Sequence, residues 1–384
     1  MNSSEIEEMK WSIFFCIHVM VLFVVFVSFD PVFGEPDTSF RASSRPFTPS
    51  NETLQIQQKQ NMLYQFINSK LRGRHGVFTN YRDTDQSAQL ATGHEVLSES
   101  EGLLLRYFVK TNQRSAFDRE WALVKRTLNL ASGFSYRYSP KLPKRYSTNA
   151  AVDDLRIIRA LYEAASTFKN TTYKNEADTY AKRFYTYNTK NGYVYDFYDA
   201  SYQMTNQSIM LCYIDLTTLQ RLPGPLDQQR QLYSNMLSVI QNGYVSHIFP
   251  FYETRYQYDT HSYHSENINT VESLLTILAL VEVNQQKPES IVYLKEQVRS
   301  GTLYGQYTRE GIPTNTIQST AIYALTAMIG SELDDQELYE NSIQRMSQFQ
   351  VNNADSPLYG SFGDTKSQTV YSFDNLMALL AFSY

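Results

Sequence analysis

Carboxylates stand at the start of several helix-period segments of the chain. Glu99 and Glu101 directly precede the apolar run Leu103–Leu105. Hydrolysis of a glycosidic bond uses two carboxyl groups, one of them held protonated by an apolar setting. Successive helical residues turn by about 100°, so Glu99 and Glu101 point in different directions and one of them should face solvent. At the mouth of a helical barrel Glu101 would lie against apolar walls, which makes it the candidate proton donor.

The chain is unusually rich in aromatic residues. Its 384 residues include 30 Tyr and 22 Phe, and many of them gather in the longer segments between helices. An aromatic ring stacks on the apolar C–H face of a sugar, and a tyrosine hydroxyl adds a hydrogen bond. Clustering of such residues at one end of a domain therefore favours a sugar-binding groove. The candidate groove residues are Tyr136, Tyr195, Tyr252 and Tyr256, with Arg255 beside them.

Twelve segments carry the hydrophobic period of an α-helix. Short and long connections alternate between them, and a short connection makes two helices antiparallel. All six long connections should therefore lie at one end of the domain. We predict an all-α fold, an (α/α)6 toroid of about twelve helices, because the repeating signature of an α-solenoid is absent. The expected helices are 51–71, 94–112, 115–131, 149–168, 171–187, 207–221, 226–242, 265–284, 288–300, 315–330, 334–349 and 372–383.

The N-terminus carries an apolar run. Residues 11–29 contain no Asp, Glu, Lys or Arg. At 1.5 Å per residue, a helix of this length nearly spans the roughly 30 Å hydrocarbon core of a membrane. Segment 1–30 is therefore expected to be a signal peptide or a membrane anchor, and both remain open. Segment 31–50 is predicted to be a linker, and 51–384 an extracytoplasmic domain, either anchored or secreted.

Composition excludes several classes of protein. The chain has 34 Lys+Arg against 39 Asp+Glu, a formal charge of −5, which argues against a nucleic-acid binder. Two cysteines exclude a disulfide scaffold and a Cys-rich metal site. There is no HExxH element, phosphate-binding loop or dinucleotide glycine fingerprint. We predict that the chemistry needs neither a metal nor a cofactor.

Three segments, taken in order, resemble glycoside hydrolase family 8. The sequence SESEG at 98–102 precedes a hydrophobic helix, NQRSAFD follows at 112–118, and TNAAVDDLRIIRALYEA stands at 148–164. In that family a Ser-Glu-Gly element carries the catalytic acid, and a later Asp-x-Asp helix supplies an aspartate to the central sugar subsite. The resemblance implies an (α/α)6 barrel and an inverting endo-glycanase. The chain looks like a divergent hydrolase of the kind found in exopolysaccharide operons.

The resemblance assigns roles to individual residues. Glu101, between Ser100 and Gly102, matches the general acid of the family. Asp154 matches the second aspartate of the Asp-x-Asp element, so it is expected to bind substrate. Val152 stands where the first aspartate would be, and Asp153 is interpreted as a residue of the helix start.

The general base is less well defined. The family places it in a Tyr-Asp-Ala-x-x-Arg-like element, which the pair Tyr252-Glu253 with Arg255 matches in part. Glu253 is therefore the candidate base and Asp259 the alternative, while Glu272, Asp196 and Asp199 also compete. In the implied mechanism Glu101 protonates the glycosidic oxygen, and the base activates a water from about 6.5–9.5 Å away.

The predicted function is hydrolysis of a β-linked exopolysaccharide outside the cytoplasm. The expected partners are the polysaccharide, the membrane through the N-terminal helix, and an exopolysaccharide synthase. One alternative is a non-catalytic, anchored polysaccharide-binding protein, which the missing aspartate at Val152 favours. A polysaccharide lyase, with a base among His247, His261 and His264, is a further alternative.

Overall fold

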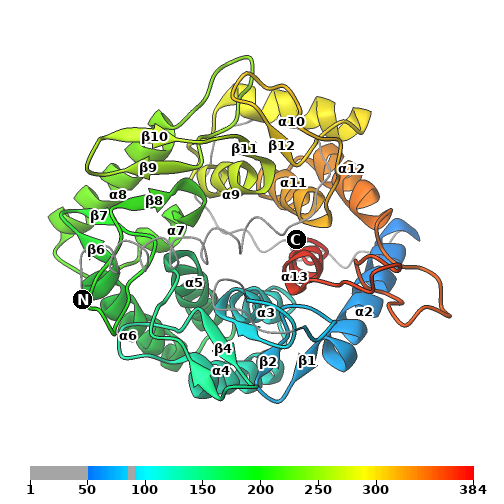
Figure 1. The fold of residues 1–384 in the computed structure, drawn as a ribbon, viewed down its shortest axis with the longest axis horizontal. Helices are drawn as coiled ribbons and strands as arrows, with labels where there is room; N and C mark the ends of the chain where they lie inside the picture. The colour runs from blue at the N-terminus through cyan, green and yellow to red at the C-terminus, as the bar shows by residue number, and fades with distance from the viewer. Residues whose placement is uncertain (1–50, 85–90) are drawn as a thin grey trace.

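The helices form two concentric rings (Figure 1). The computed structural model describes residues 51–84 and 91–384, so the predicted segments 1–30 and 31–50 lie outside the described residues. Within the described residues there are twelve α-helices, as predicted. The inner ring contains α3 (Ser98–Lys110), α5 (Ala151–Thr167), η1 (Leu211–Tyr213) with α7 (Leu216–Leu219), α9 (Thr270–Val281), α11 (Thr320–Glu332) and α13 (Ser372–Ala381).

The outer ring surrounds these helices, and the inner ring closes on itself. Each inner helix contacts the next one, and α13 returns to α3, which completes the circle. An (α/α)6 toroid of this kind is what the alternation of short and long connections predicts. The outer helices are α2 (Asn51–Lys70), α4 (Arg114–Leu128), α6 (Thr171–Asn188), α8 (Leu226–Asn242), α10 (Pro288–Ser300) and α12 (Gln336–Ser347).

Connections differ between the two ends of the toroid. From an inner helix to the following outer helix the chain needs few residues, as at 111–113 and 333–335. The return connections are long and contain short antiparallel strands. These strands are β1 (Arg72–Gly73), β2 (Gly76–Val77), β3 (Val96–Leu97), β4 (Arg137–Ser139), β5 (Lys144–Arg145), β6 (Thr189–Lys190), β7 (Tyr193–Val194), β8 (Ser208–Met210), β9 (Arg255–Gln257), β10 (Ser262–His264), β11 (Ile268–Asn269) and β12 (Gln306–Tyr307).

The segment 207–221 differs from the expected helix. It begins as β8, which pairs with β9, and continues as the single turn η1 and the four-residue helix α7. Asp215 divides η1 from α7, because its carboxylate accepts hydrogen bonds from the backbone and hydroxyl of Thr218 and so caps a new helix. A short apolar run has no period that separates a strand from a buried helix, which explains the wrong prediction.

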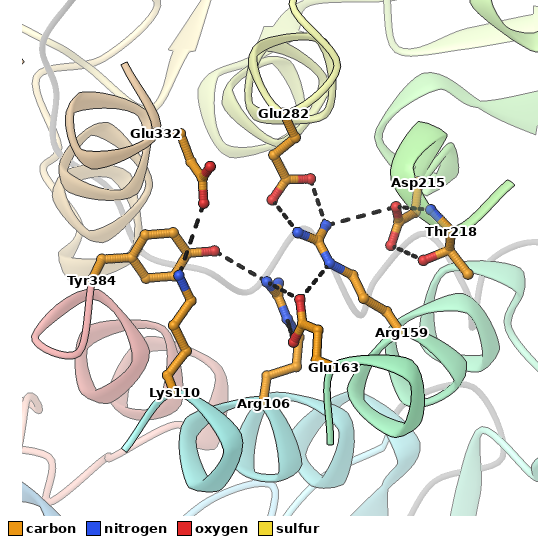
Figure 2. Close-up of polar contacts among 9 residues, drawn as sticks. All are labelled: Arg106, Lys110, Arg159, Glu163, Asp215, Thr218, Glu282, Glu332 and Tyr384. Atoms are coloured by element: carbon orange, nitrogen blue, oxygen red, sulfur yellow. Dashed lines mark hydrogen bonds and ion pairs between the residues drawn. The ribbon is translucent and has the colours of Figure 1, made fainter. Parts of the chain in front are cut away.

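Charged side chains join the inner helices at the end of the ring where these helices finish (Figure 2). Arg159 Nη2 lies 2.8 Å from Glu282 Oε1, and Arg159 Nε lies 2.9 Å from Glu163 Oε1. Arg106 Nη2 lies 3.2 Å from the same Glu163 oxygen. We call this group the closed-end network; its further members are Lys110, Asp215, Glu332 and Tyr384.

The predicted membrane segment precedes the described residues. No helix in residues 51–84 or 91–384 is long and apolar enough to cross a membrane. The apolar run 11–29 lies outside this part of the chain.

Candidate active site

Acidic residues occupy the first turns of four inner helices. Glu99 begins α3, Asp153 begins α5, Glu272 begins α9 and Asp374 begins α13. Because all inner helices start at the same end of the ring, these four side chains gather around one mouth of the toroid. We call them the mouth carboxyls. The positive end of each helix dipole favours acidic side chains in these positions.

Glu99 is the mouth carboxyl with properties of a proton donor. Its side chain is partly exposed, whereas Ser98 and Ser100 on either side are buried. Burial in the ring, followed by the negative charge of Asp153 and then that of Asp374, raises the pKa of Glu99 to about 8; Arg156 opposes this shift. Glu99 is therefore protonated at neutral pH, as a general acid must be.

Asp153 lies directly beside Glu99. Its Oδ2 accepts a 2.7 Å hydrogen bond from Ser98 Oγ, and its Oδ1 accepts a 2.7 Å bond from Arg156 Nη1. Burial raises the pKa of Asp153, while Arg156 and Ser98 act in the opposite direction. Asp153, interpreted from the sequence as a residue of the helix start, thus belongs to the mouth of the ring.

Two further mouth carboxyls complete the set. Burial raises the pKa of Asp374 to about 7, although its Oδ1 accepts hydrogen bonds from Ala321 N at 3.0 Å and Ser319 Oγ at 3.4 Å. Burial also raises the pKa of Glu272 to about 7, against the effect of a hydrogen bond from Thr254 and the charge of Arg255. In the order of inner helices around the ring, α9 is diametrically opposite α3, and Glu272 stands in the first turn of α9 as Glu99 stands in that of α3.

Glu101 lies on the other side of α3. Its Oε1 accepts a 2.8 Å hydrogen bond from the backbone N–H of Val77 in β2, and the residue is 1% exposed. Burial, followed by the neighbouring carboxylate of Glu120 on the outer helix α4, raises the pKa of Glu101 well above its usual range. The structure thus places Glu101 in the wall between the two rings, where a sugar does not reach.

Asp154 is also a wall residue. Its Oδ1 accepts a 3.2 Å bond from the backbone N–H of Phe134, and its Oδ2 accepts a 2.8 Å bond from Asn149 Nδ2. Gly133 runs so close to this carboxylate that a Cβ there would lie 2.0 Å from Oδ2. Asp154 therefore secures the turn before β4.

The residues predicted as bases lie in different settings. Glu253 is buried and forms an ion pair with Arg309, while its Oε2 has no hydrogen-bond partner in the described residues. Asp259 is exposed at the turn between β9 and β10, where it accepts a bond from Thr260 N. Asp196 accepts a 2.7 Å bond from Met210 N and faces Arg255, whose Nη2 lies 3.7 Å from its Oδ2.

Most of the predicted groove tyrosines serve packing. Tyr136, Tyr195 and Tyr252 are 6%, 4% and 2% exposed. Tyr195 packs against the Tyr258 ring with centroids 4.8 Å apart. Tyr256 is only half-buried, and its hydroxyl lies 3.2 Å from His261 Nδ1. Sequence patterning identified the aromatic end of the domain but not which rings remain available to a ligand.

The mouth carboxyls are not arranged as a metal centre. In residues 51–84 and 91–384, no group of three or more His, Cys, Asp or Glu side chains could hold a metal ion. What the arrangement offers is acid–base chemistry: a partly exposed, protonated Glu99 with Asp153 and Asp374 beside it, and Glu272 on the helix opposite.

Comparison with known proteins shows the same architecture. No protein-family model matches the sequence. An endoglucanase from Klebsiella pneumoniae, a family 8 glycosyl hydrolase, is 15% identical with a TM-score of 0.55, over 74% of this chain and 98% of that one. A novel alpha-amylase from Clostridium perfringens is 33% identical with a TM-score of 0.79, over 85% of this chain and 97% of that one. The chain belongs to the family of this alpha-amylase, and its structural neighbours include glycoside hydrolase family 8 enzymes.

A sequence relative adds to this picture. The Bacillus subtilis (strain 168) protein named "Putative lipoprotein YdaJ" is 26% identical over 295 residues, which cover 74% of this chain and 78% of that protein. The resemblance read from the three sequence segments is thus confirmed at the level of the family. As proton donor, the family motif pointed to Glu101, whereas the geometry favours Glu99. The sequence signal for Glu99 was its place two residues before Glu101 in the same turn.

Proposed function

We propose that this protein is a glycoside hydrolase that cleaves a polysaccharide with inversion, and that Glu99 is its general acid. One observation supports this most strongly. Glu99 is a partly exposed carboxyl at the mouth of the ring, and its surroundings keep it protonated at neutral pH. Glu101, which the family motif suggests, is enclosed between β2 and α4.

For the general base we propose Glu272. An inverting enzyme needs its second carboxyl on the opposite face of the sugar, with room for a water between. Glu272 stands across the ring from Glu99, whereas Asp374 stands on the neighbouring helix. Glu272 Oε2 is a buried atom with no hydrogen-bond partner in the described residues, and Glu253 Oε2 shares this property, so the position of α9 opposite α3 is what favours Glu272. Glu253 instead forms an ion pair with Arg309.

The proposed substrate is a neutral polysaccharide, and two linkage classes compete. The sequence analysis favours β-linked exopolysaccharides. The relative with 33% identity is an alpha-amylase, which favours an α-linked glucan. The test is a panel of both: amylose-type α-glucans, β-1,4- and β-1,3-glucans, and amino-sugar exopolysaccharides, each assayed for new reducing ends.

The decisive variants differ by two positions. In the full-length chain, Glu99→Gln should lower kcat by about 10²–10⁴-fold, the usual contribution of general acid catalysis. Glu101→Gln is the matched control, because it makes the same substitution one half-turn away and should retain activity. Loss of activity in Glu101→Gln alone, with both proteins folded, would contradict the assignment.

The base has a separate test. Glu272→Gln should also lose activity, but azide should restore part of it, because this anion attacks the sugar without a general base. Azide should not restore Glu99→Gln. Restoration of Glu253→Gln instead of Glu272→Gln would transfer the role of the base to Glu253.

A non-catalytic, polysaccharide-binding protein is the second candidate. Val152 stands in place of an aspartate that the family uses at its central subsite, and this substitution favours lost activity. In that case wild type and Glu99→Gln would bind a polymer of the panel equally well, and neither of them would release reducing ends.

We also propose that the protein works outside the cytoplasm at a membrane. The apolar run 11–29 and the relative named as a lipoprotein support this location. Protease added to intact cells should digest the domain while cytoplasmic proteins survive. Association with an exopolysaccharide synthase stays a prediction, for which co-purification from solubilised membranes is the measurement.

A further inference from the structure

One carboxylate joins the first turns of α3 and α5. Asp153 accepts hydrogen bonds on both oxygens, from Ser98 Oγ and from Arg156 Nη1, each at 2.7 Å. The backbone N–H of Glu99 also donates to it. Asp153 is 2% exposed, so these contacts fix its position beside Glu99, and each of them favours its charged form against burial.

Gly102 makes room for this arrangement. Ser98 and Gly102 are four residues apart and therefore share the face of α3 that meets α5. A Cβ on Gly102 would lie 3.1 Å from Arg156 Cδ and 3.2 Å from Arg156 Cγ, which is tighter than ordinary packing. The aliphatic part of Arg156 thus crosses α3 at its glycine, and the guanidinium reaches Asp153.

Charged or titratable side chains from α5, α13 and η1 face Glu99. Asp153 and Arg156 come from α5, Asp374 comes from α13, and the phenol of Tyr213 comes from η1. On α4 the acidic neighbour, Glu120, faces Glu101 instead. Among these groups Asp153 is the one with a direct hydrogen bond to the Glu99 backbone.

We propose that Asp153 is a positioning residue that keeps the proton on Glu99 above neutral pH, and that Ser98 and Arg156 hold it ionised for this role. The inference rests on the proposed role of Glu99 as general acid. A negative charge on Asp153 disfavours a second negative charge on Glu99, so Glu99 stays protonated over a wider range of pH. Asp153 itself need not touch the sugar.

The test is the pH dependence of kcat/KM for the full-length chain and for Asp153→Asn, which keeps shape and hydrogen-bonding oxygen. Wild type should lose activity as pH rises past about 8, where Glu99 loses its proton. In Asp153→Asn this alkaline limb should move down by about one pH unit, a tenfold change in the proton equilibrium of Glu99. Asp154→Asn is the matched control and should leave the limb in place, because Asp154 faces Phe134 and Asn149.

The proposal would be overturned if Asp153→Asn lowered kcat equally at every pH and left the alkaline side of the pH profile where it is in wild type. A merely structural role of Asp153 predicts that result. Ser98→Ala offers a second variant if Asp153→Asn does not fold; it should shift the limb in the same direction by less. A measurement without substrate separates this proposal from the proposed function. In ¹³C NMR of carboxyl-labelled Glu, with the signal assigned through Glu99→Gln, the Glu99 titration should shift in Asp153→Asn even if no polymer is hydrolysed.

Discussion

The two ends of the inner ring carry the same types of side chain in opposite electrostatic states. At the mouth, burial raises the pKa of Glu99 to about 8 and those of Glu272 and Asp374 to about 7. At the closed end, burial acts in the same direction, but Arg106 and Arg159 outweigh it and lower the pKa of Glu163 to about 2. Burial alone therefore does not set the behaviour of these carboxyls.

The difference lies in the cations. Arg159 bridges α5 to α9 by pairing with Glu282, and it contacts Glu163 on its own helix. At the mouth, Arg156 and Arg255 oppose the raised pKa values of Glu99 and Glu272 but do not outweigh burial, and the Arg156 guanidinium is paired with Asp153. A carboxylate that an arginine holds ionised contributes to the stability of the fold. A carboxyl whose pKa stays raised can exchange a proton near neutral pH. The comparison separates a structural end from a chemical end of one ring.

Removal of the central cation should have the largest effect on stability. Arg159→Met leaves the buried Glu282 carboxylate without its partner and Glu163 with Arg106 alone, so the free energy of unfolding should fall by about 3–5 kcal/mol. Denaturant titration measures it. The control is Arg114→Met, whose exposed pair with Asp118 should contribute about 0–1 kcal/mol. Similar small losses for both variants would erase the distinction between the two ends.

Acid should weaken the closed end. The folded-state pKa of Glu163 lies below its ordinary value, so its stabilisation is complete above about pH 4.5 and disappears as pH falls toward about 2. The expected contribution is on the order of 3 kcal/mol. Stability curves of wild type and Glu163→Gln should converge across this range. Parallel curves would show that the arginines do not hold Glu163 ionised.

Rising pH should destabilise the mouth, which is the opposite of the pH dependence expected at the closed end. Because the pKa of Asp374 is raised in the folded state, its contribution to the free energy of unfolding is complete below about pH 4. This contribution is lost as pH rises toward about 7. Asp374→Asn should therefore be more stable than wild type at pH 8, by roughly 1–3 kcal/mol, and close to wild type at pH 4. Thermal unfolding at the two pH values checks the sign, and a larger loss for Asp374→Asn at pH 8 would contradict it.

Glu101 should show the same sign as Asp374. Burial, followed by Glu120, raises its pKa well above its usual range, so the folded state favours the protonated form and stability falls as pH rises. Glu101→Gln, which is neutral at every pH, should match wild type near pH 4 and exceed it near pH 9. Denaturant midpoints at both pH values measure this. A lower midpoint at pH 9 would show that Glu101 is ionised in the fold.

Helix periodicity and loop lengths predicted much of the architecture. Segments such as 171–187 and 288–300 were placed to within one residue, because their caps and apolar stripes are local features. The third inner helix was predicted too long, at 207–221, because pairing of β8 with β9 is a long-range contact. Short strands such as β3 give no period of their own.

The candidate site was predicted only in outline. Sequence reasoning found the acidic turn at 99–101 and the pair Asp153–Asp154, but in each case it chose the residue that faces the wall. The choice depends on which side of α3 meets α5, and this is set by Gly102 against Arg156 rather than by local sequence. Glu272 was recognised only as a competitor, since its position across from Glu99 requires the closed ring.

The central claim is that the mouth performs chemistry and the closed end holds the fold. The most direct measurement takes kcat and the free energy of unfolding together for Glu99→Gln and Arg159→Met. The account predicts that Glu99→Gln loses about 10²–10⁴-fold in kcat with its stability intact. Arg159→Met should lose stability while the fraction that remains folded keeps its kcat. A stable, inactive Arg159→Met beside an active Glu99→Gln would contradict the account.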